Sequence, residues 1–397
     1  MIAGAAALVL LIALQTPAPA APSRDTLIPV HTPYLDIVWK YLDGDTRGAI
    51  ADLSGLSTNG LEEQVFHDLN RVTLRMVSGG RDDMRDMKEI QRLMLARTWS
   101  TLAHAAAILH LDTARMMLDR DETSMNAGLE HLGIARHLMD WSHWDGITST
   151  LRMEKAAETH QRVRRGVYLA IAYILQNHVQ IKMAKDHLKL AREAFPGDAE
   201  VLLASGSAEE LGADVAIVRQ MQVPAGARVS DGWRRMIRSA GLSKAEEYLR
   251  EATVRDPKLA EAHMRFGRVL YERGKLPEAR RSYETARDLH PIGEIAYLAA
   301  LFLARLTEDE GNNASAFEQY RAMVATWPDC HAAHVALSRM FEMRGERQLA
   351  LGALSPLWRA LEQRACPVDP WWVYKYGQAW RLGPLMESLR AEVRSWS

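Results

Sequence analysis

Apolar residues in the second half of the chain recur at helical spacing, and the pattern itself repeats every 34 residues. Alternation typical of strands is absent, and no run of β-branched residues is bounded by hairpin turns. Three pairs of residues lie 34 positions apart: Ala245 and Ala279, Pro257 and Pro291, and Ala316 and Ala350. This period predicts stacked helical hairpins, because one hairpin cannot bury its apolar face alone. We therefore expect an all-α chain.

Residues 260–293 show the pattern of one hairpin most completely. In order, its positions are His263, Phe266, Gly267 and Leu270, then the turn residue Gly274, then Ala279, Tyr283 and Pro291. The arrangement resembles the tetratricopeptide repeat, which has W-x2-L-G-x2-Y in its first helix, A-x3-F in its second and a closing proline. The small residues Gly267 and Ala279 should let the two helices approach closely. The resemblance implies a right-handed α-solenoid whose concave groove is free to bind a partner.

Looser copies flank this hairpin. We place the repeats at 165–198, 199–259, 260–293, 294–330 and 331–364. Residues 199–259 are interpreted as one repeat with an insertion at about 212–242, because Ala245 follows the small residue Gly206 by 39 positions instead of 12. The alternative is two separate degenerate units. Insertions in such repeats map to loops on one face of the solenoid.

The first half of the chain predicts a helical extension of the same body. Over residues 21–160 we expect a repeat-like helix pair near 34–55, where Tyr41, Gly44, Ala49 and Leu53 reproduce the spacing of the complete hairpin. Longer helices are expected from Asp83 to about Leu118 and from about Glu122 to Trp141.

The first twenty residues are similar to a secretory signal peptide. Residues 1–14 are apolar and uncharged, and Ala18 and Ala20 follow in an A-x-A arrangement. The run is too short for a comfortable membrane span, and no Lys or Arg precedes it. We expect a signal peptide at 1–20 and an exported bacterial protein, periplasmic or secreted, without a membrane span after cleavage. The alternative is a chain anchored to the membrane by an uncleaved segment.

The charge balance argues against polyanionic partners. The chain has 49 Lys and Arg against 50 Asp and Glu, for a formal net charge of −1. Nucleic acid or an anionic membrane would call for a basic excess. The short cluster of Arg234, Arg235 and Arg238 is more typical of a solvated helix face. We expect no nucleic-acid partner.

Two cysteines and several histidines are the candidates for covalent or metal chemistry. Cys330 and Cys366 lie 36 residues apart and could form a disulfide if local loops bend inward. His331 and His334 could join them around zinc, but His334 matches the aromatic core position of its repeat. The histidines of the first half are spaced six residues apart in two groups and do not share a helix face: His104 and His110, and His131, His137 and His143. We expect no metal and no cofactor.

The motifs of common enzyme families are absent. The sequence has no G-x-G-x-x-G, no phosphate-binding loop, no H-E-x-x-H and no G-x-S-x-G. The carboxylates of Glu308, Asp309 and Glu310 are interpreted as a solvated turn. We predict a protein that is not an enzyme, and an enzyme assembled from dispersed residues is the third alternative.

Residues 365–397 carry the densest aromatic cluster. Asp369 can cap a short helix that has Pro370 in its first turn. The large rings are Trp371, Trp372, Tyr374 and Trp380. They are expected to form aromatic capping helices that seal the open end of the last repeat. Alternatively, these four residues bind a glycan or small ligand.

The resemblance also places a partner in the groove that the first helices line. In each first helix, the residue one position after the small residue is expected to face the groove, and these residues form one lane along it. Two further residues, one helical turn further along their helices, are expected to face the same way. The predicted groove residues are Tyr173, Gln176, Arg268, Tyr271, Phe302 and Arg339, with Ser207 in the same lane. Arginines and aromatic rings suit an extended peptide with carboxylate groups. We therefore predict a protein-interaction scaffold of the cell envelope that binds a partner protein or peptide.

Overall fold

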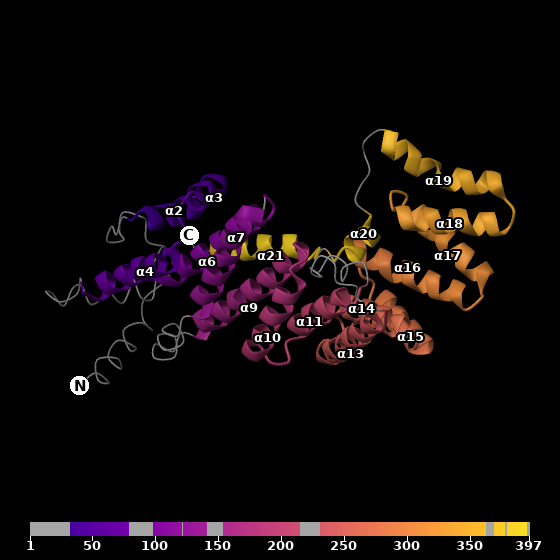
Figure 1. Cartoon of the computed structure of the whole chain (residues 1–397), viewed down its shortest axis with the longest axis horizontal. Helices are drawn as coiled ribbons and strands as arrows, with labels where there is room; N and C mark the ends of the chain where they lie inside the picture. Colours follow the sequence, from indigo (N-terminus) through magenta and orange to yellow (C-terminus); the bar gives the residue numbers. More distant parts are fainter. Residues whose placement is uncertain are drawn as a thin grey trace, which may run out of the picture. The chain divides into compact units, whose positions relative to one another are not determined.

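A computed structural model describes residues 32–78, 98–120, 122–140, 154–214, 231–362, 369–377 and 379–394. These residues form helices and turns without a strand, which confirms the predicted all-α fold (Figure 1). The chain divides into two compact units: unit 1 is Met1–Ile174 with Arg381–Ser397, and unit 2 is Leu175–Trp380. No helix in the described part of the chain combines the length and apolar character needed to cross a bilayer.

Unit 2 is a stack of helical hairpins. Its first helices are α11 (Ala199–Gly212), α14 (Ala260–Glu272), α16 (Gly293–Asp309) and α18 (His331–Met343). Their second helices are α13 (Asp231–Arg255), α15 (Leu276–Asp288), α17 (Asn313–Thr326) and α19 (Arg347–Glu362), while α10 (Ile181–Ala194) precedes the stack and α20 (Pro370–Lys375) follows it. Each first helix packs on its own second helix, and α11, α14 and α16 also contact one another in sequence. This is the α-solenoid that the repeat predicted.

Glycines set the spacing within the first two hairpins of unit 2. A Cβ atom on Gly267 would lie 2.6 Å from Tyr283 Cδ1 and 3.2 Å from the carbonyl oxygen of Ala279. A Cβ atom on Gly206, at the equivalent place in α11, would lie 2.5 Å from Leu249. Because a Cβ atom does not fit at either place, side chains of the second helix pack directly against the backbone of the first helix in these two hairpins.

The turns inside three hairpins share one backbone conformation. Gly274, Gly311 and Gly345 have φ angles of +75°, +83° and +76°. A residue with a side chain rarely adopts this left-handed conformation, so glycine ends each first helix and starts the return.

The second helix of the interrupted repeat is longer than expected. It begins at Asp231, so the arginine cluster of residues 234–238 lies in the first turns of α13, within the stretch of about 212–242 that we interpreted as an insertion. Gly241, which we interpreted as a loop residue, is also helical. It allows α13 to pack closely against the end of α11, since a Cβ atom there would lie 3.0 Å from Ala213 Cβ. Residues 215–230, within the predicted insertion, lie outside the described residues.

The last hairpin exposes positions that earlier hairpins bury. Val335 is 55% exposed and Leu351 is 56% exposed. The residues at the same positions of the preceding hairpin, Leu298 and Phe317, are buried. The contrast marks α18 and α19 as the end of the described stack.

Unit 1 is built around one buried helix. Its members are α2 (Pro33–Leu42), α3 (Thr46–Ser54), α4 (Leu61–Ser78), α6 (Thr98–Leu118), α7 (Glu122–Asp140), most of α9 (Glu154–Asn177) and α21 (Leu382–Arg394). Helix α6 contacts α2, α3, α4, α7 and α21. Gly44, with φ +98°, turns the chain between α2 and α3.

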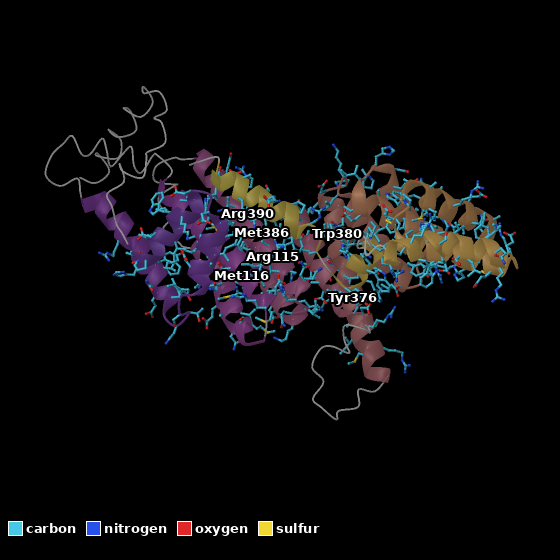
Figure 2. All side chains as sticks on the ribbon, turned by 90° about the horizontal axis from the view of Figure 1, so that it is seen from above. Arg115, Met116, Tyr376, Trp380, Met386 and Arg390 are labelled. Carbon is cyan, nitrogen blue, oxygen red and sulfur yellow. The ribbon has the colours of Figure 1, made fainter. Side chains whose placement is uncertain are left out.

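A buried carboxylate ties two distant helices of unit 1 together. Asp112 on α6 accepts a hydrogen bond of 2.9 Å from the hydroxyl of Tyr41. It also forms an ion pair with Arg390, which projects from α21 beside Met386 (Figure 2). Because Asp112 is almost fully buried, this forked arginine contact compensates its charge and holds the carboxyl-terminal helix on α6.

The close approach at Gly267 gives a direct test of the hairpin geometry. Gly267→Val should lower the free energy of unfolding by roughly 1–3 kcal/mol, because the new side chain must displace the buried Tyr283 ring. Gly352→Ala is the matched control, since Gly352 is helical and has open space around it. The control should stabilise the protein by up to about 1 kcal/mol through helix propensity. Denaturant titration followed by circular dichroism measures both, and equal effects would contradict the packing described.

Candidate partner-binding groove

The first helices of unit 2 line a pocket of about 590 Å³ that joins the two predicted sites. Four of the six predicted groove residues line it, together with two residues of the alternative aromatic site: Arg268, Tyr271, Phe302, Arg339, Trp371 and Trp372. We call this pocket the open trough. The groove lane and the aromatic cluster are therefore parts of one surface.

Apolar side chains form much of the trough. Leu301 and Phe302 come from α16, and Val335 and Ala336 come from α18. Trp372 is 46% exposed and contributes from α20. Apolar surface that remains exposed inside a concavity is typical of a binding site.

The arginines of the trough are already paired with carboxylates. Arg268 pairs with Glu272 four residues later, and Arg339 on α18 pairs with Glu308 on α16. Glu308 also accepts a hydrogen bond of 3.1 Å from Tyr320, and its side chain is only 8% exposed. The predicted solvated turn is thus a helix end with a buried carboxylate. Because these guanidinium groups are neutralised within the chain, the trough favours apolar over strongly acidic ligands.

Arg268 also organises the aromatic rings. Its guanidinium carbon lies 5.1 Å from the ring centre of Tyr271, 5.4 Å from that of Phe302 and 5.9 Å from that of Trp371. A cation among three rings is stabilised by their negative faces. Arg268 therefore fixes the wall of the trough, in addition to its ion pair with Glu272.

The chain's own carboxyl-terminal segment occupies the neighbouring part of the concave face. We call residues 369–380, apart from Gln378, the strap. Its helix α20 packs against α16 (Figure 1), and the ring of Tyr374 meets that of Phe302 edge to face at 5.3 Å. The sequence predicted an aromatic cap on the end of the last repeat, whereas these rings lie on first helices of earlier repeats. The rings of Trp371, Tyr374 and Trp380 lie against arginines, and Trp371 and Tyr374 also contact Phe302, whereas Trp372 is 46% exposed.

Arg265 is the centre of the strap's binding surface. Its guanidinium lies 5.0 Å from the ring centres of both Tyr374 and Trp380. Its nitrogens reach Glu261 Oε1 at 2.9 Å and Glu210 Oε2 at 3.1 Å. A buried arginine between two rings and two carboxylates has its charge and its hydrogen-bonding groups satisfied.

Polar contacts hold the strap along its length. The hydroxyl of Tyr374 donates to Glu210, and Lys375 pairs with Asp214. Burial raises the pKa of Glu210, although the charge of Arg265 acts to lower it. Burial, and then the charge of Glu210, raises the pKa of Tyr374 well above its ordinary value, so the phenol stays protonated and donates.

Both ends of the strap are also fixed to the repeats. Asp369 accepts a hydrogen bond of 2.9 Å from the backbone of Ala332 on α18, and one of 2.6 Å from the Trp371 amide, which caps α20 within the strap. At the other end, Gln176 donates to the carbonyl of Gly377 at 2.7 Å, and the Ala379 amide donates to Asn177 at 2.6 Å.

The remaining predicted groove residues are buried. Gln176 is engaged with the strap, and Tyr173 lies within α9 with 5% of its surface exposed. The sequence analysis missed Arg265, Glu210 and Asp214. Arg265 could have been found by extending the lane one helical turn back from Arg268, whereas the two carboxylates carried no separate signal.

A second, more polar pocket of about 370 Å³ borders the strap. Its lining includes Ser207, Asp214, Arg238, Arg265 and Lys375. Ser207, which we expected in the lane, lines this second pocket and not the open trough. The pocket shows that space remains on the concave face beside the strap.

The cysteine and histidine cluster near α18 does not assemble as a zinc site among the described residues. His334 is buried, and its two ring nitrogens lie 2.8 Å from the carbonyl oxygens of Ala353 and Pro328. Neither nitrogen is left for a metal, which agrees with its predicted core position. Cys366 lies outside the described residues, so its disulfide with Cys330 remains a prediction.

Several histidines of the first half pair inside unit 1. His104 Nε2 lies 3.0 Å from His160 Nδ1, and His110 Nδ1 lies 2.7 Å from His131 Nδ1. Tyr34 extends the second pair through a contact of 3.1 Å with His110 Nε2. Across the described ranges, no group of three or more His, Cys, Asp or Glu residues is placed to hold a metal ion.

The other two histidines of the predicted spacing are separate from these pairs. His137 contacts Glu62 and Arg136. His143 lies outside the described residues. The paired histidines are structural, and they come from different helices.

Stacked hairpins with an open concave face define the class of helical-repeat interaction scaffolds. Residues 238–294 and 264–329 match the family model described as Tetratricopeptide repeat. Residues 238–329 are therefore tetratricopeptide repeats, in agreement with the predicted family.

Solved structures give distant similarities. The chain is 19% identical to MamA over 47% of this chain and 91% of that one, with a TM-score of 0.34. It is 15% identical to PilF of Pseudomonas aeruginosa over 59% and 90% of the two chains, with a TM-score of 0.39. It is 16% identical to YrrB, a tetratricopeptide repeat protein with an unusual peptide-binding site, over 48% and 82%, with a TM-score of 0.33. No curated protein sequence matches the chain. TM-scores below 0.5 carry no argument about shared function.

The buried histidines of unit 1 predict a specific dependence of stability on pH. Burial lowers the pKa of His104 to about 3 and that of His131 to about 4. In the unfolded chain the pKa of histidine is about 6.5. Below that pH the unfolded chain binds protons that the folded chain does not, so the free energy of unfolding is highest above about pH 6.5 and decreases as the pH falls toward 4. His104→Gln should reduce the slope of unfolding free energy against pH by up to about 1.4 kcal/mol per pH unit.

His67→Gln is the control for this experiment, because the His67 side chain is 69% exposed. Its slope should match that of the unmodified protein. Thermal or denaturant unfolding between pH 7 and 4 provides the measurement, and coincident slopes for His104→Gln and the unmodified protein would rule out a neutral buried His104.

Proposed function

We propose that the protein is a non-enzymatic scaffold that binds a partner protein or peptide in the open trough. The observation that carries this proposal is the pocket of about 590 Å³ across three successive first helices. Its rings and aliphatic side chains offer an anchor point for a large apolar side chain of the partner. Helical-repeat proteins use their concave faces in this way.

A polar group in the trough supports a polypeptide ligand. His331 lines the trough, and its buried Nε2 atom has no hydrogen-bond partner within the described part of the chain. A backbone amide or carbonyl of a bound peptide would satisfy it, because a neutral imidazole nitrogen can donate or accept according to its tautomer. The trough thus offers an apolar anchor site with one polar contact beside it.

The alternative of a glycan site has less support. Trp371, Tyr374 and Trp380 are engaged by arginines and by Phe302, so their faces are not free for a sugar. Trp372 is more exposed, but it stacks on Tyr376 with ring centres 5.6 Å apart. An enzyme has less support still, because the carboxylates nearest the trough, Glu272 and Glu308, pair with arginines.

We also propose that the scaffold acts in the cell envelope after export. The support is the sequence of residues 1–20, with its uncharged apolar run and its A-x-A site. These residues lie outside the described part of the chain. Partners would then be other envelope proteins.

Site-specific photo-cross-linking tests the trough. A benzoylphenylalanine in place of Val335, inside the trough, should give discrete protein adducts in cells of the source organism. The same residue in place of Val254, on the second helix α13 and 71% exposed, should not. Trp372→Ser should reduce the adducts at Val335 about tenfold, which corresponds to about 1.4 kcal/mol. Equal labelling from both positions would contradict binding in the trough.

Analysis of the mature protein tests export. Mass spectrometry of the chain purified from the envelope fraction should find Ala21 as its first residue. Changing Ala18 and Ala20 to arginine should leave a larger, uncleaved species, because the peptidase requires small residues there. Recovery of a chain that retains Met1 and stays in the cytosol would refute the proposal.

A further inference from the structure

The strap is a peptide ligand supplied by the chain itself. It is tied to its surface through side chains that lie far away in the sequence: Tyr374 contacts Glu210 across 164 positions, and Lys375 contacts Asp214 across 161. Gln176 and Asn177 also bind its backbone. This mixture of anchored side chains and hydrogen-bonded backbone is how a protein groove holds a peptide.

The binding surface under the strap is specific in its chemistry. Arg265 faces the rings of both Tyr374 and Trp380, each at 5.0 Å. Glu210 accepts a hydrogen bond from the Tyr374 hydroxyl, and Asp214 forms an ion pair with the ammonium group of Lys375. A ligand for this surface therefore needs an aromatic residue with a hydroxyl, a lysine directly after it and a second large ring nearby.

The strap also forms part of the wall of the open trough. Trp371 lies in the wall of that trough and is held over Arg268. The ring of Phe302 is shared, since it lines the trough and contacts both Trp371 and Tyr374. Release of the strap would leave one continuous surface from α11 to α18 for a ligand.

We infer that the surface around Glu210, Asp214 and Arg265 is a peptide-binding site for a segment that has a Tyr-Lys pair and a second large ring, as Tyr374, Lys375 and Trp380 provide in the strap. The strap occupies this site in the resting chain, and a partner segment of the same chemistry displaces it. This inference rests on the proposed scaffold function and names the ligand class for the adjoining surface. The strap then acts as a built-in competitor: the protein's apparent affinity for the partner is the intrinsic affinity multiplied by the fraction of molecules in which the strap is released.

The probe for this site is a fluorescent peptide with the sequence of residues 369–380. Fluorescence anisotropy should show weak binding to the full-length protein, because its own strap fills the site. A variant with Trp371→Ala, Tyr374→Ala and Lys375→Ala should bind the peptide at least tenfold more tightly. When Glu210→Gln and Asp214→Asn are added to that variant, peptide binding should weaken at least tenfold, toward the affinity of the unmodified protein.

A second variant releases the strap without removing any of its rings. Gly377 has φ +71°, and a Cβ atom there would lie 2.3 Å from Leu211 Cδ2. Gly377→Ala should therefore disfavour the seated strap and raise peptide affinity in the same direction. Gly383→Ala is the control, since it lies just beyond the strap with open space around it, and it should leave the affinity unchanged. Circular dichroism confirms that each variant is folded.

The outcomes separate this inference from the proposed function. Equal peptide affinity in the unmodified protein and in Gly377→Ala would overturn it, as would equal binding of a peptide with the same residues in scrambled order. A dimer that exchanges straps, detected by sedimentation, would also overturn the intramolecular assignment. Adducts at Val335 would still support the open trough in each of these cases, whereas their absence would contradict the scaffold proposal independently of the strap.

Discussion

The first two hairpins of unit 2 depend on the absence of a side chain at one position of the first helix. Gly267 and Gly206 bring their helices into contact with Tyr283 and Leu249, and no methyl group would fit in between. This contact fixes the distance between the two helices of a hairpin. The second helices then form one layer and the first helices another, so that side chains on the inner layer face a common concavity. Every feature of the candidate site follows from that arrangement.

Two arginines one turn apart on α14 divide the concave face into two parts. Arg265 is nearly fully buried and belongs to the surface under the strap, where it lies between two rings and two carboxylates. Arg268 stands at the border, in contact with Trp371 of the strap and with Tyr271 and Phe302 of the trough. Because both charges are balanced within the chain, recognition in the trough depends on shape, apolar contact and a few hydrogen bonds.

The sequence could predict the repeats because their causes are local. A small residue, a turn glycine and a closing proline appear at fixed spacing, and Gly267, Gly274 and Ala279 take the roles expected of them. The groove residues Arg268, Tyr271, Phe302 and Arg339 followed from the same register. The strap could not be predicted in this way, because its contacts join residues more than 160 positions apart.

Chemical type alone was also misleading in two places. The aromatic cluster suggested an end cap because large rings need burial, but the sequence does not say which surface provides it. Glu308 appeared to lie in a solvated turn beside Gly311, whereas α16 continues through Asp309 and buries this carboxylate with Arg339. In both cases the deciding partner came from another repeat.

The strap can occupy its site in most molecules even if its intrinsic affinity for that site is modest. Because strap and surface belong to one chain, binding is intramolecular, with an effective concentration on the order of 1 mM. A segment that would bind with a Kd of roughly 10–100 µM as a free peptide would then occupy its site in about 90–99% of molecules. A partner segment of equal intrinsic affinity would be disfavoured about tenfold to a hundredfold. Only a partner that also uses the apolar trough, which the strap leaves open, gains the additional contacts needed to compete.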